Sequence, residues 1–175
     1  VFLILSLFMS QFYIWSSGLP QFSQLFIVLA FFTFVIKYKV INTSSTKFLF
    51  VFLSYVVLVN SVWFFANGFD FSYIISTLYW IFNFLTFTLL VNLKKESIEV
   101  FFEWLLKIIF LSYLLGVVIW LVGAGRYDFA PRYNGFFNDP NQMAFWVLST
   151  CSIYLCISEK KIKNIIVLIL AIFLL

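Results

Sequence analysis

Long runs of apolar residues alternate with short polar segments along the whole chain. Each run is continuous rather than alternating in polarity, and the bilayer core offers no water to an exposed backbone, so we expect every run to be helical. A membrane barrel would instead show alternating strands of about ten residues. Seven apolar segments can be drawn: residues 1–15, 22–36, 48–66, 73–93, 105–122, 143–157 and 165–175. The pattern predicts an all-α integral membrane protein with about seven transmembrane helices.

Both ends of the chain are apolar. Val1 is not an initiator Met, and residues 165–175 are apolar up to the last residue. A helix needs about 20 residues to span a bilayer. We therefore interpret residues 1–175 as a single polytopic membrane domain that is incomplete at both ends, with its first and last helices truncated.

Composition narrows the class of protein. Hydrophobic residues make up 64% of the chain and charged residues 10%, whereas about a quarter of the residues in a soluble domain are charged. The eleven basic residues are scattered along the chain, so we expect no nucleic-acid partner. The chain has no His and only two Cys, which excludes a zinc-type cluster, and we expect no metal and no cofactor.

Lysine positions predict the orientation in the membrane. All nine Lys lie in three alternate loops: residues 37–47, residues 94–107 and the loop after the sixth segment. The other loops hold no Lys and only two Arg. Because cytoplasmic loops carry an excess of positive charge, the Lys-rich loops should be cytoplasmic, and the loop of residues 123–142 should face the periplasm or cell exterior.

Residues 94–107 form an amphipathic segment. Phe101, Phe102 and Trp104 supply its apolar part, and Glu99, Glu103 and Lys107 recur at a spacing of four residues, which favours a helix. We interpret this segment as an interfacial lead-in to the fifth span; a surface that binds a partner is the alternative.

Both arginines of the chain, Arg126 and Arg132, lie in the outward loop. A guanidinium group is a planar fork that binds phosphate or carboxylate through two hydrogen bonds. Two such groups six residues apart indicate an anionic ligand at the outer membrane surface. In the alternative interpretation, Asp128 or Asp139 forms ion pairs with the arginines, which then only stabilise the loop and bind no ligand.

The end of this loop predicts the start of a helix. Asp139 is a good N-cap, Pro140 is favoured at the first helical position, and Gln142 has capping-box spacing. The free N–H groups of such a helix end can bind an anion. Gly135 permits a positive φ or the close approach of a ligand. Two loop side chains, Asn134 and Asn138, can donate amide hydrogen bonds. The aromatic residues of the loop could stack on sugar faces or anchor in the membrane interface: Tyr127, Tyr133, Phe136 and Phe137.

The run Arg132-Tyr-Asn-Gly-Phe-Phe-Asn-Asp-Pro-Asn-Gln-Met-Ala resembles the first signature of the O-antigen polymerase and O-antigen ligase superfamily. That signature is an Arg, a Gly about three residues on, an aromatic residue, and Asn/Asp-Pro-Asn at the start of a membrane helix. The matching positions are Arg132, Gly135, Phe136, Pro140 and Asn141. The resemblance covers about a dozen residues and otherwise rests on hydropathy and the order of the spans.

The resemblance implies a membrane glycosyltransferase with a helical bundle similar to the GT-C type and without metal. Its substrates would be oligosaccharide repeat units on undecaprenyl pyrophosphate, which it would polymerise into O-antigen, capsule or exopolysaccharide. The reaction would occur on the outer face of the bacterial cytoplasmic (inner) membrane. Expected partners are the lipid-linked glycan, membrane lipid, and other polysaccharide-assembly proteins such as a chain-length regulator.

In this interpretation Arg132, and less certainly Arg126, contact the pyrophosphate, and Gly135 and Asn141 line the same pocket. Asn134, Asn138, Asp139, Pro140 and Gln142 shape the loop and cap the helix. The catalytic residues are unknown and are expected beyond Leu175.

Two other functions stay open. A ligase would transfer glycan to a lipid or protein acceptor, and this half of the pattern does not separate it from a polymerase. A transporter or flippase for an anionic lipid or solute belongs to a different class, and it should carry ionisable residues near mid-depth of its spans. No predicted span has a clear charged residue there.

Overall fold

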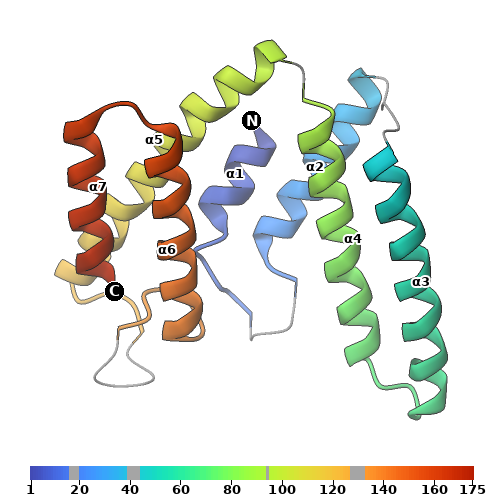
Figure 1. Cartoon of the computed structure of the whole chain (residues 1–175). Helices are drawn as coiled ribbons and strands as arrows, with labels where there is room; N and C mark the ends of the chain where they lie inside the picture. Colours follow the sequence, from blue (N-terminus) through green and yellow to red (C-terminus); the bar gives the residue numbers. More distant parts are fainter. Residues whose placement is uncertain (16–19, 39–43, 94, 127–132) are drawn as a thin grey trace. The chain divides into compact units, whose positions relative to one another are not determined.

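A computed structural model describes residues 1–15, 20–38, 44–93, 95–126 and 133–175 (Figure 1). In these residues the regular structure is helical and no strand is formed, apart from one isolated bridge between Arg126 and Gly135. The helices are α1 (Phe2–Met9), α2 (Phe22–Lys37), α3 (Ser44–Ala66), α4 (Ser72–Val91), α5 (Lys95–Leu121), α6 (Pro140–Ile157) and α7 (Lys161–Leu174).

Each of the seven predicted apolar segments overlaps one of these helices. Within the described residues, three are long and apolar enough to cross a membrane: Ser44–Ala66, Ser72–Val91 and Ile98–Leu121. Helix α2 is a shorter apolar helix of 16 residues. The chain is therefore an all-helical protein whose long apolar helices suit a membrane, as the hydropathy pattern predicts.

Helix α5 begins at Lys95, ten residues before the fifth apolar segment. The amphipathic lead-in is thus continuous with the span that follows it. Glu103 and Lys107, one helical turn apart, form an ion pair of 2.6 Å on the surface of this helix. Lys107 also lies 4.8 Å from the centre of the Trp104 ring, which places a cation over an aromatic face.

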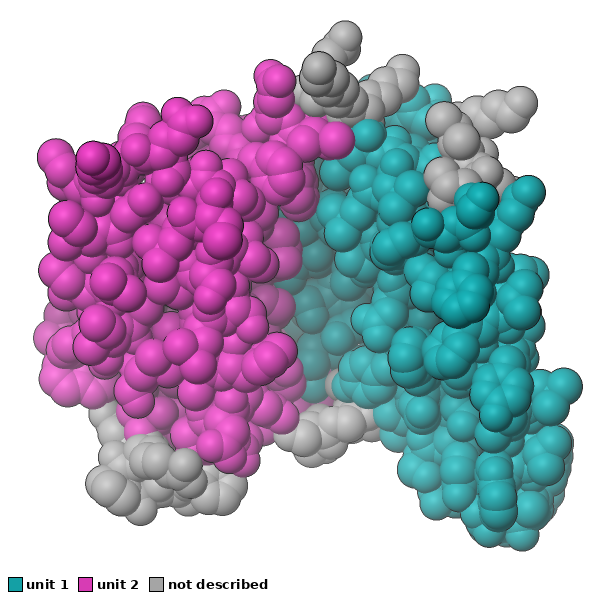
Figure 2. Space-filling view, viewed as in Figure 1, with its two compact units in different colours: residues 1–6, 18–94 teal, residues 7–17, 95–175 magenta. Residues whose placement is uncertain are grey.

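The chain divides into two compact units, which Figure 2 shows in different colours. Unit 1 comprises Val1–Ser6 and Gly18–Lys94. In it α4 packs against both α2 and α3. Side-chain contacts join α3 to α4. The Asn60 amide donates to the Thr77 hydroxyl at 2.9 Å, and the Phe52 and Trp80 rings meet edge to face at 5.0 Å.

A tight turn joins α3 to α4. Gly68 and Phe69 have φ values of +69° and +67°, a region that is easy for glycine and strained for phenylalanine. Asp70 follows, and its carboxylate accepts the N–H of Ser72 at 2.9 Å. Hydrogen bonds from the backbone and side chain of Ser72 lower the pKa of Asp70, because they stabilise the charged carboxylate.

Unit 2 comprises Leu7–Ser17 and Lys95–Leu175, and α5, α6 and α7 pack against one another in it. Its centre is Tyr113 of α5, which is fully buried. The Tyr113 hydroxyl donates to the Val147 carbonyl of α6 at 2.6 Å and lies 2.8 Å from the Thr150 hydroxyl. Because a buried phenol needs such partners, this contact fixes how α5 lies against α6.

Candidate functional site

The loop of residues 123–142, which the lysine pattern predicts to face outward, is closed at its base by backbone hydrogen bonds. The Arg126 N–H donates to the Gly135 carbonyl at 2.8 Å, and the Asn134 N–H donates to the Arg126 carbonyl at 3.1 Å. Gly135 has a φ of +57°, which explains why a glycine suits this position. Residues 127–132 lie outside the described part of the chain, so the structure reports nothing on Arg132, Asp128 or Tyr127.

The Arg126 side chain binds neutral oxygens. Its Nη1 donates to the Asn138 side-chain oxygen at 2.6 Å, and its Nη2 lies 3.4 Å from the Tyr13 carbonyl. The Asn138 amide nitrogen in turn donates to the Trp15 carbonyl at 2.9 Å. The guanidinium therefore contacts Asn138 rather than Asp139, and its charge has no counter-ion in the described residues.

Asn134 shapes the loop from inside. Its side chain is completely buried, and its amide nitrogen donates to the Phe137 carbonyl at 2.7 Å. A backbone hydrogen bond of 2.9 Å from the Phe137 N–H to the Asn134 carbonyl closes the same turn. This amide nitrogen therefore serves the turn and is not directed to a ligand outside the loop.

The Phe137 ring is part of the packed interior. It is 5% exposed, and its centre lies 5.6 Å from the ring centre of Tyr13 and 5.8 Å from that of Trp146. Phe136 likewise packs on Phe12 at 5.5 Å. The expectation that Phe137 stacks on a sugar is wrong for this arrangement, because the flanking aromatic rings cover it.

Helix α6 begins at Pro140, as its sequence predicts. Asp139 is the N-cap, and its carboxylate accepts the Asn141 N–H at 2.6 Å. The Met143 N–H donates to the Asp139 carbonyl at 3.2 Å. Pro140 has no N–H to offer, so an anion at this helix end would have to compete with the Asp139 carboxylate. The Asn141 residue itself is exposed, and Gln142 is half-buried at the third helical position.

The segment after α1 is the part of this site that the sequence did not reveal. Besides the Tyr13 and Trp15 carbonyls, it contributes the Tyr13 N–H, which donates to the Phe136 carbonyl at 3.0 Å. Most of these contacts use backbone atoms, which any residue type provides. The residue types at positions 13–15 could therefore not have shown that this segment contacts the loop.

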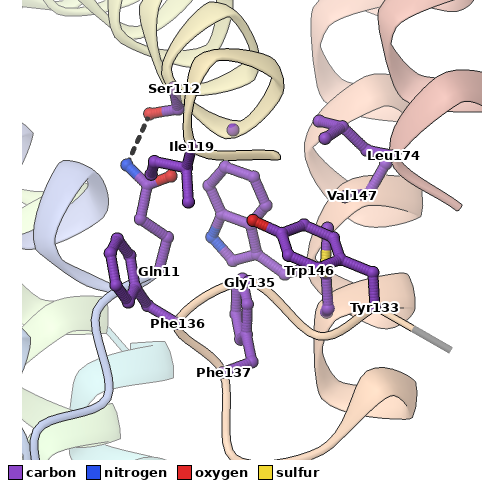
Figure 3. A pocket seen from close by; sticks show the side chains of 12 residues that line it. Gln11, Ser112, Ile119, Tyr133, Gly135, Phe136, Phe137, Trp146, Val147 and Leu174 are labelled. Carbon is purple, nitrogen blue, oxygen red and sulfur yellow. Dashed lines mark hydrogen bonds between the residues drawn. The ribbon is translucent and has the colours of Figure 1, made fainter. Parts of the chain in front are cut away.

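A small cavity lies behind the loop (Figure 3). Gln11 crosses one side of it and donates to the Ser112 hydroxyl at 3.2 Å. Other walls come from the loop, α5, α6 and α7, and include Gly135, Ile119, Trp146 and Leu174. The volume of about 20 Å³ accommodates about one water molecule, so this cavity is too small for a saccharide. Among the described residues, no group of three His, Cys, Asp or Glu could hold a metal ion.

Comparison of the chain with protein-family models, with curated proteins and with solved structures gave no match. The resemblance to the O-antigen polymerase and ligase superfamily therefore stays an expectation, which rests on the run that begins at Arg132 and on hydropathy and span order.

Proposed function

We propose that this chain is part of a membrane glycosyltransferase that polymerises oligosaccharide repeat units carried on undecaprenyl pyrophosphate. The observation that carries the proposal is the folded base of the outward loop. There Arg126 is fixed by Asn138 and Gly135, and the chain's second arginine follows in the same loop, within the run that resembles the family signature.

The chemistry of the reaction gives these arginines a role. The bond between the anomeric carbon and the pyrophosphate oxygen breaks, and a hydroxyl of the acceptor sugar forms the new glycosidic bond. Negative charge then grows on the departing undecaprenyl pyrophosphate, while the hydroxyl proton passes to a base that we do not assign. Fixed cationic hydrogen-bond donors stabilise such a leaving group most in its transition state.

The two arginines would have different tasks. Arg126 already holds Asn138 and reaches toward the Tyr13 carbonyl, so it would present a prepositioned cation at the base of the loop. Arg132 matches the signature and would form the main fork on the pyrophosphate. The N-terminus of α6 would bind the pyrophosphate less strongly than the sequence predicts, because the Asp139 carboxylate already accepts the Asn141 N–H.

Contacts within unit 2 support the proposed orientation. The segment from Tyr13 to Trp15 contacts residues 126, 136 and 138, and the lysine-based topology assigns both regions to the outer side. The lysines at 160, 161 and 163 lie at the opposite end of α6. For a helix of 18 residues that separation is about 27 Å, close to the thickness of the bilayer core. We infer a multi-pass protein of the bacterial cytoplasmic membrane, with its lysine-rich loops in the cytoplasm.

The test is Arg132→Lys in the protein expressed in its own cell, with Lys161→Arg as the matched control. Loss of the arginine fork should shorten or abolish the glycan polymer and cause lipid-linked repeat units to accumulate on the outer leaflet. The control, an exchange between the same two residue types on the lysine-rich side, should leave the glycan unchanged. Normal glycan length and amount in Arg132→Lys would contradict the proposed role.

The same experiment separates the other two functions. A ligase defect would leave full-length polymer on undecaprenyl pyrophosphate. A flippase defect would trap single repeat units on the cytoplasmic leaflet, out of reach of an externally added glycosidase.

A further inference from the structure

A second and larger recess of unit 2 lies at the other end of α6 from the loop that holds Arg126. It is a groove of about 850 Å³ between α5, from Glu99 to Leu114, and the end of α6 with the turn into α7. These helices can be followed in Figure 1. On α5 its lining residues recur at helical spacing, from Glu99 and Glu103 through Lys107 to Leu114, so one face of this helix forms a wall of the groove.

Polarity changes along this wall. Its first three turns carry charged side chains, and its later turns carry Phe110, Leu111 and Leu114. Leu111 is 50% exposed and Leu114 is 39% exposed, so the apolar end of the groove is open. From Glu99 to Leu114 the wall is about 22 Å long. A ligand that matches the groove must therefore be charged at one end and apolar at the other.

The charges at the polar end are balanced. Three carboxylates, of Glu99, Glu103 and Glu159, line it together with three ammonium groups, of Lys107, Lys160 and Lys163. In the described residues only Glu103 and Lys107 form an ion pair. Lys160 is close enough to Glu103 for an electrostatic interaction, whereas Glu99 on the α5 wall and Lys163 on the α7 side form no ion pair in the described residues.

The α7 side also presents a helix end. Lys160 is the N-cap of α7 and makes no side-chain capping hydrogen bond, so the positive end of the helix dipole adds to the two lysines. An anionic group is favoured on this side of the groove, and a cationic group is favoured beside Glu99 and Glu103 on the other side.

We propose that the groove binds one phospholipid whose headgroup carries both a phosphate and a primary ammonium group. The phosphate contacts Lys160 and Lys163, the ammonium group donates to Glu99 and Glu103, and one acyl chain lies along Leu111 and Leu114. A headgroup with a net negative charge matches only the lysine side. A quaternary ammonium group lacks the N–H donors that the carboxylates accept.

Native mass spectrometry of the whole chain in mild detergent tests this assignment. Dioleoyl phosphatidylethanolamine, phosphatidylcholine and phosphatidylglycerol are titrated separately, so that only the headgroup differs. We expect one molecule of phosphatidylethanolamine to bind at least fivefold more tightly than either of the others. Lys160→Gln with Lys163→Gln should weaken it by about fivefold, as for the loss of a partly exposed charge pair.

Lys161→Gln is the matched control, since Lys161 begins the same helix and is exposed but does not line the groove. It should leave binding unchanged.

A second variant, Leu114→Trp, fills the apolar end without altering charge and should also weaken binding, while circular dichroism verifies that the helices persist. Three results would each overturn the proposal: phosphatidylglycerol bound as tightly as phosphatidylethanolamine, an equal effect of Lys161→Gln, or a chain dimer in place of a lipid complex.

Discussion

Nη1 of Arg126 donates a 2.6 Å hydrogen bond to the side-chain oxygen of Asn138. Through its amide nitrogen Asn138 also holds the Trp15 carbonyl. One neutral side chain thus joins the Arg126 cation to the segment that follows α1. This arrangement keeps the guanidinium charge uncompensated in the described structure, which is the state that an anionic ligand requires.

Asn138→Ala should loosen the loop. It removes both hydrogen bonds of the amide and leaves the Arg126 guanidinium with only the longer approach to Tyr13. We expect a loss of about 1–3 kcal/mol in the free energy of unfolding, measured by thermal or denaturant unfolding in detergent. In Asn138→Asp the carboxylate can still accept a hydrogen bond from Arg126, but it cannot donate one to the Trp15 carbonyl. Backbone amide exchange should therefore become faster at residues 13–15 and stay unchanged at Arg126. Wild-type exchange in both variants would contradict the bridging role.

Gly125→Ala should disturb the loop more than Gly123→Ala. A Cβ atom at Gly125 would lie 2.7 Å from the Tyr133 hydroxyl and 3.2 Å from the Gly135 carbonyl, at a φ of +107°. Gly123 also has a positive φ of +67°, but nothing lies within 4 Å of its Cβ position. We expect about 1 kcal/mol of destabilisation at Gly123 from backbone strain alone, and about 3 kcal/mol at Gly125, where overlap adds to the strain. Equal losses of stability would show that the overlap is relieved by movement of Tyr133.

Asp139→Ala should fray the start of α6. It removes the acceptor of the Asn141 N–H and should cost about 1 kcal/mol of stability, whereas Asp139→Asn retains a good N-cap and should cost a few tenths. Hydrogen exchange at Asn141 reports this local effect directly. The alanine variant also removes the carboxylate that competes with an anion at this helix end. If α6 helps to bind pyrophosphate, the affinity for it should therefore rise in this variant.

Tyr113→Phe tests the contact between α5 and α6. The variant keeps the ring and removes the hydroxyl that donates to Val147 and meets Thr150. We expect a loss of about 1 kcal/mol, while Tyr113→Ala, which also empties the packed site, should lose about 3–5 kcal/mol. Unfolding titrations in detergent measure both changes. Equal losses in the two variants would mean that the hydroxyl, and not the ring, dominates the contact.

The turn between α3 and α4 should weaken in acid. Its hydrogen bonds to Ser72 lower the pKa of the Asp70 carboxyl, so the folded state binds the proton less tightly than the unfolded state does. The contribution of Asp70 is therefore complete above its unfolded pKa and is lost as the pH falls through its lowered, folded pKa. Hydrogen exchange at Ser72, corrected for the intrinsic rate, should lose protection on acidification in the wild type. Asp70→Asn should show no such pH dependence, and a wild type without one would contradict this assignment.

The orientation of the chain can be measured by cysteine accessibility. With Cys151 and Cys156 replaced by Ala, single cysteines at Asn141 and Lys161 provide exposed probes near the two ends of α6. A membrane-impermeant maleimide added to intact cells should label Asn141→Cys and should label Lys161→Cys only after lysis. The reverse labelling pattern would contradict the proposal that the loop of residues 123–142 lies on the outer side of the membrane.

The sequence determined the helices because their signal is local. Continuous apolar runs permit no other regular structure in a bilayer, and Asp-Pro at positions 139 and 140 defines a helix start through the chemistry of two adjacent residues. The apolar run alone did not predict that α5 begins at Lys95, because the amphipathic lead-in differs from the span in composition. The spacing of Glu99, Glu103 and Lys107 predicted that the lead-in favours a helix. The sequence also supplied both arginines of the outward loop, although not the partners of either one.

Only the tertiary structure decided what Arg126 and Phe137 contact. Arg126 reaches a carbonyl more than a hundred residues away in the chain, and Phe137 is covered by Tyr13 and Trp146. Backbone carbonyls are common to all residue types, and an aromatic ring suits a sugar face or a packed interior equally well. The partners of Arg126 and Phe137 therefore depend on which segments lie close together in the folded chain. Packing throughout unit 2 decides this, and no short run of residues can.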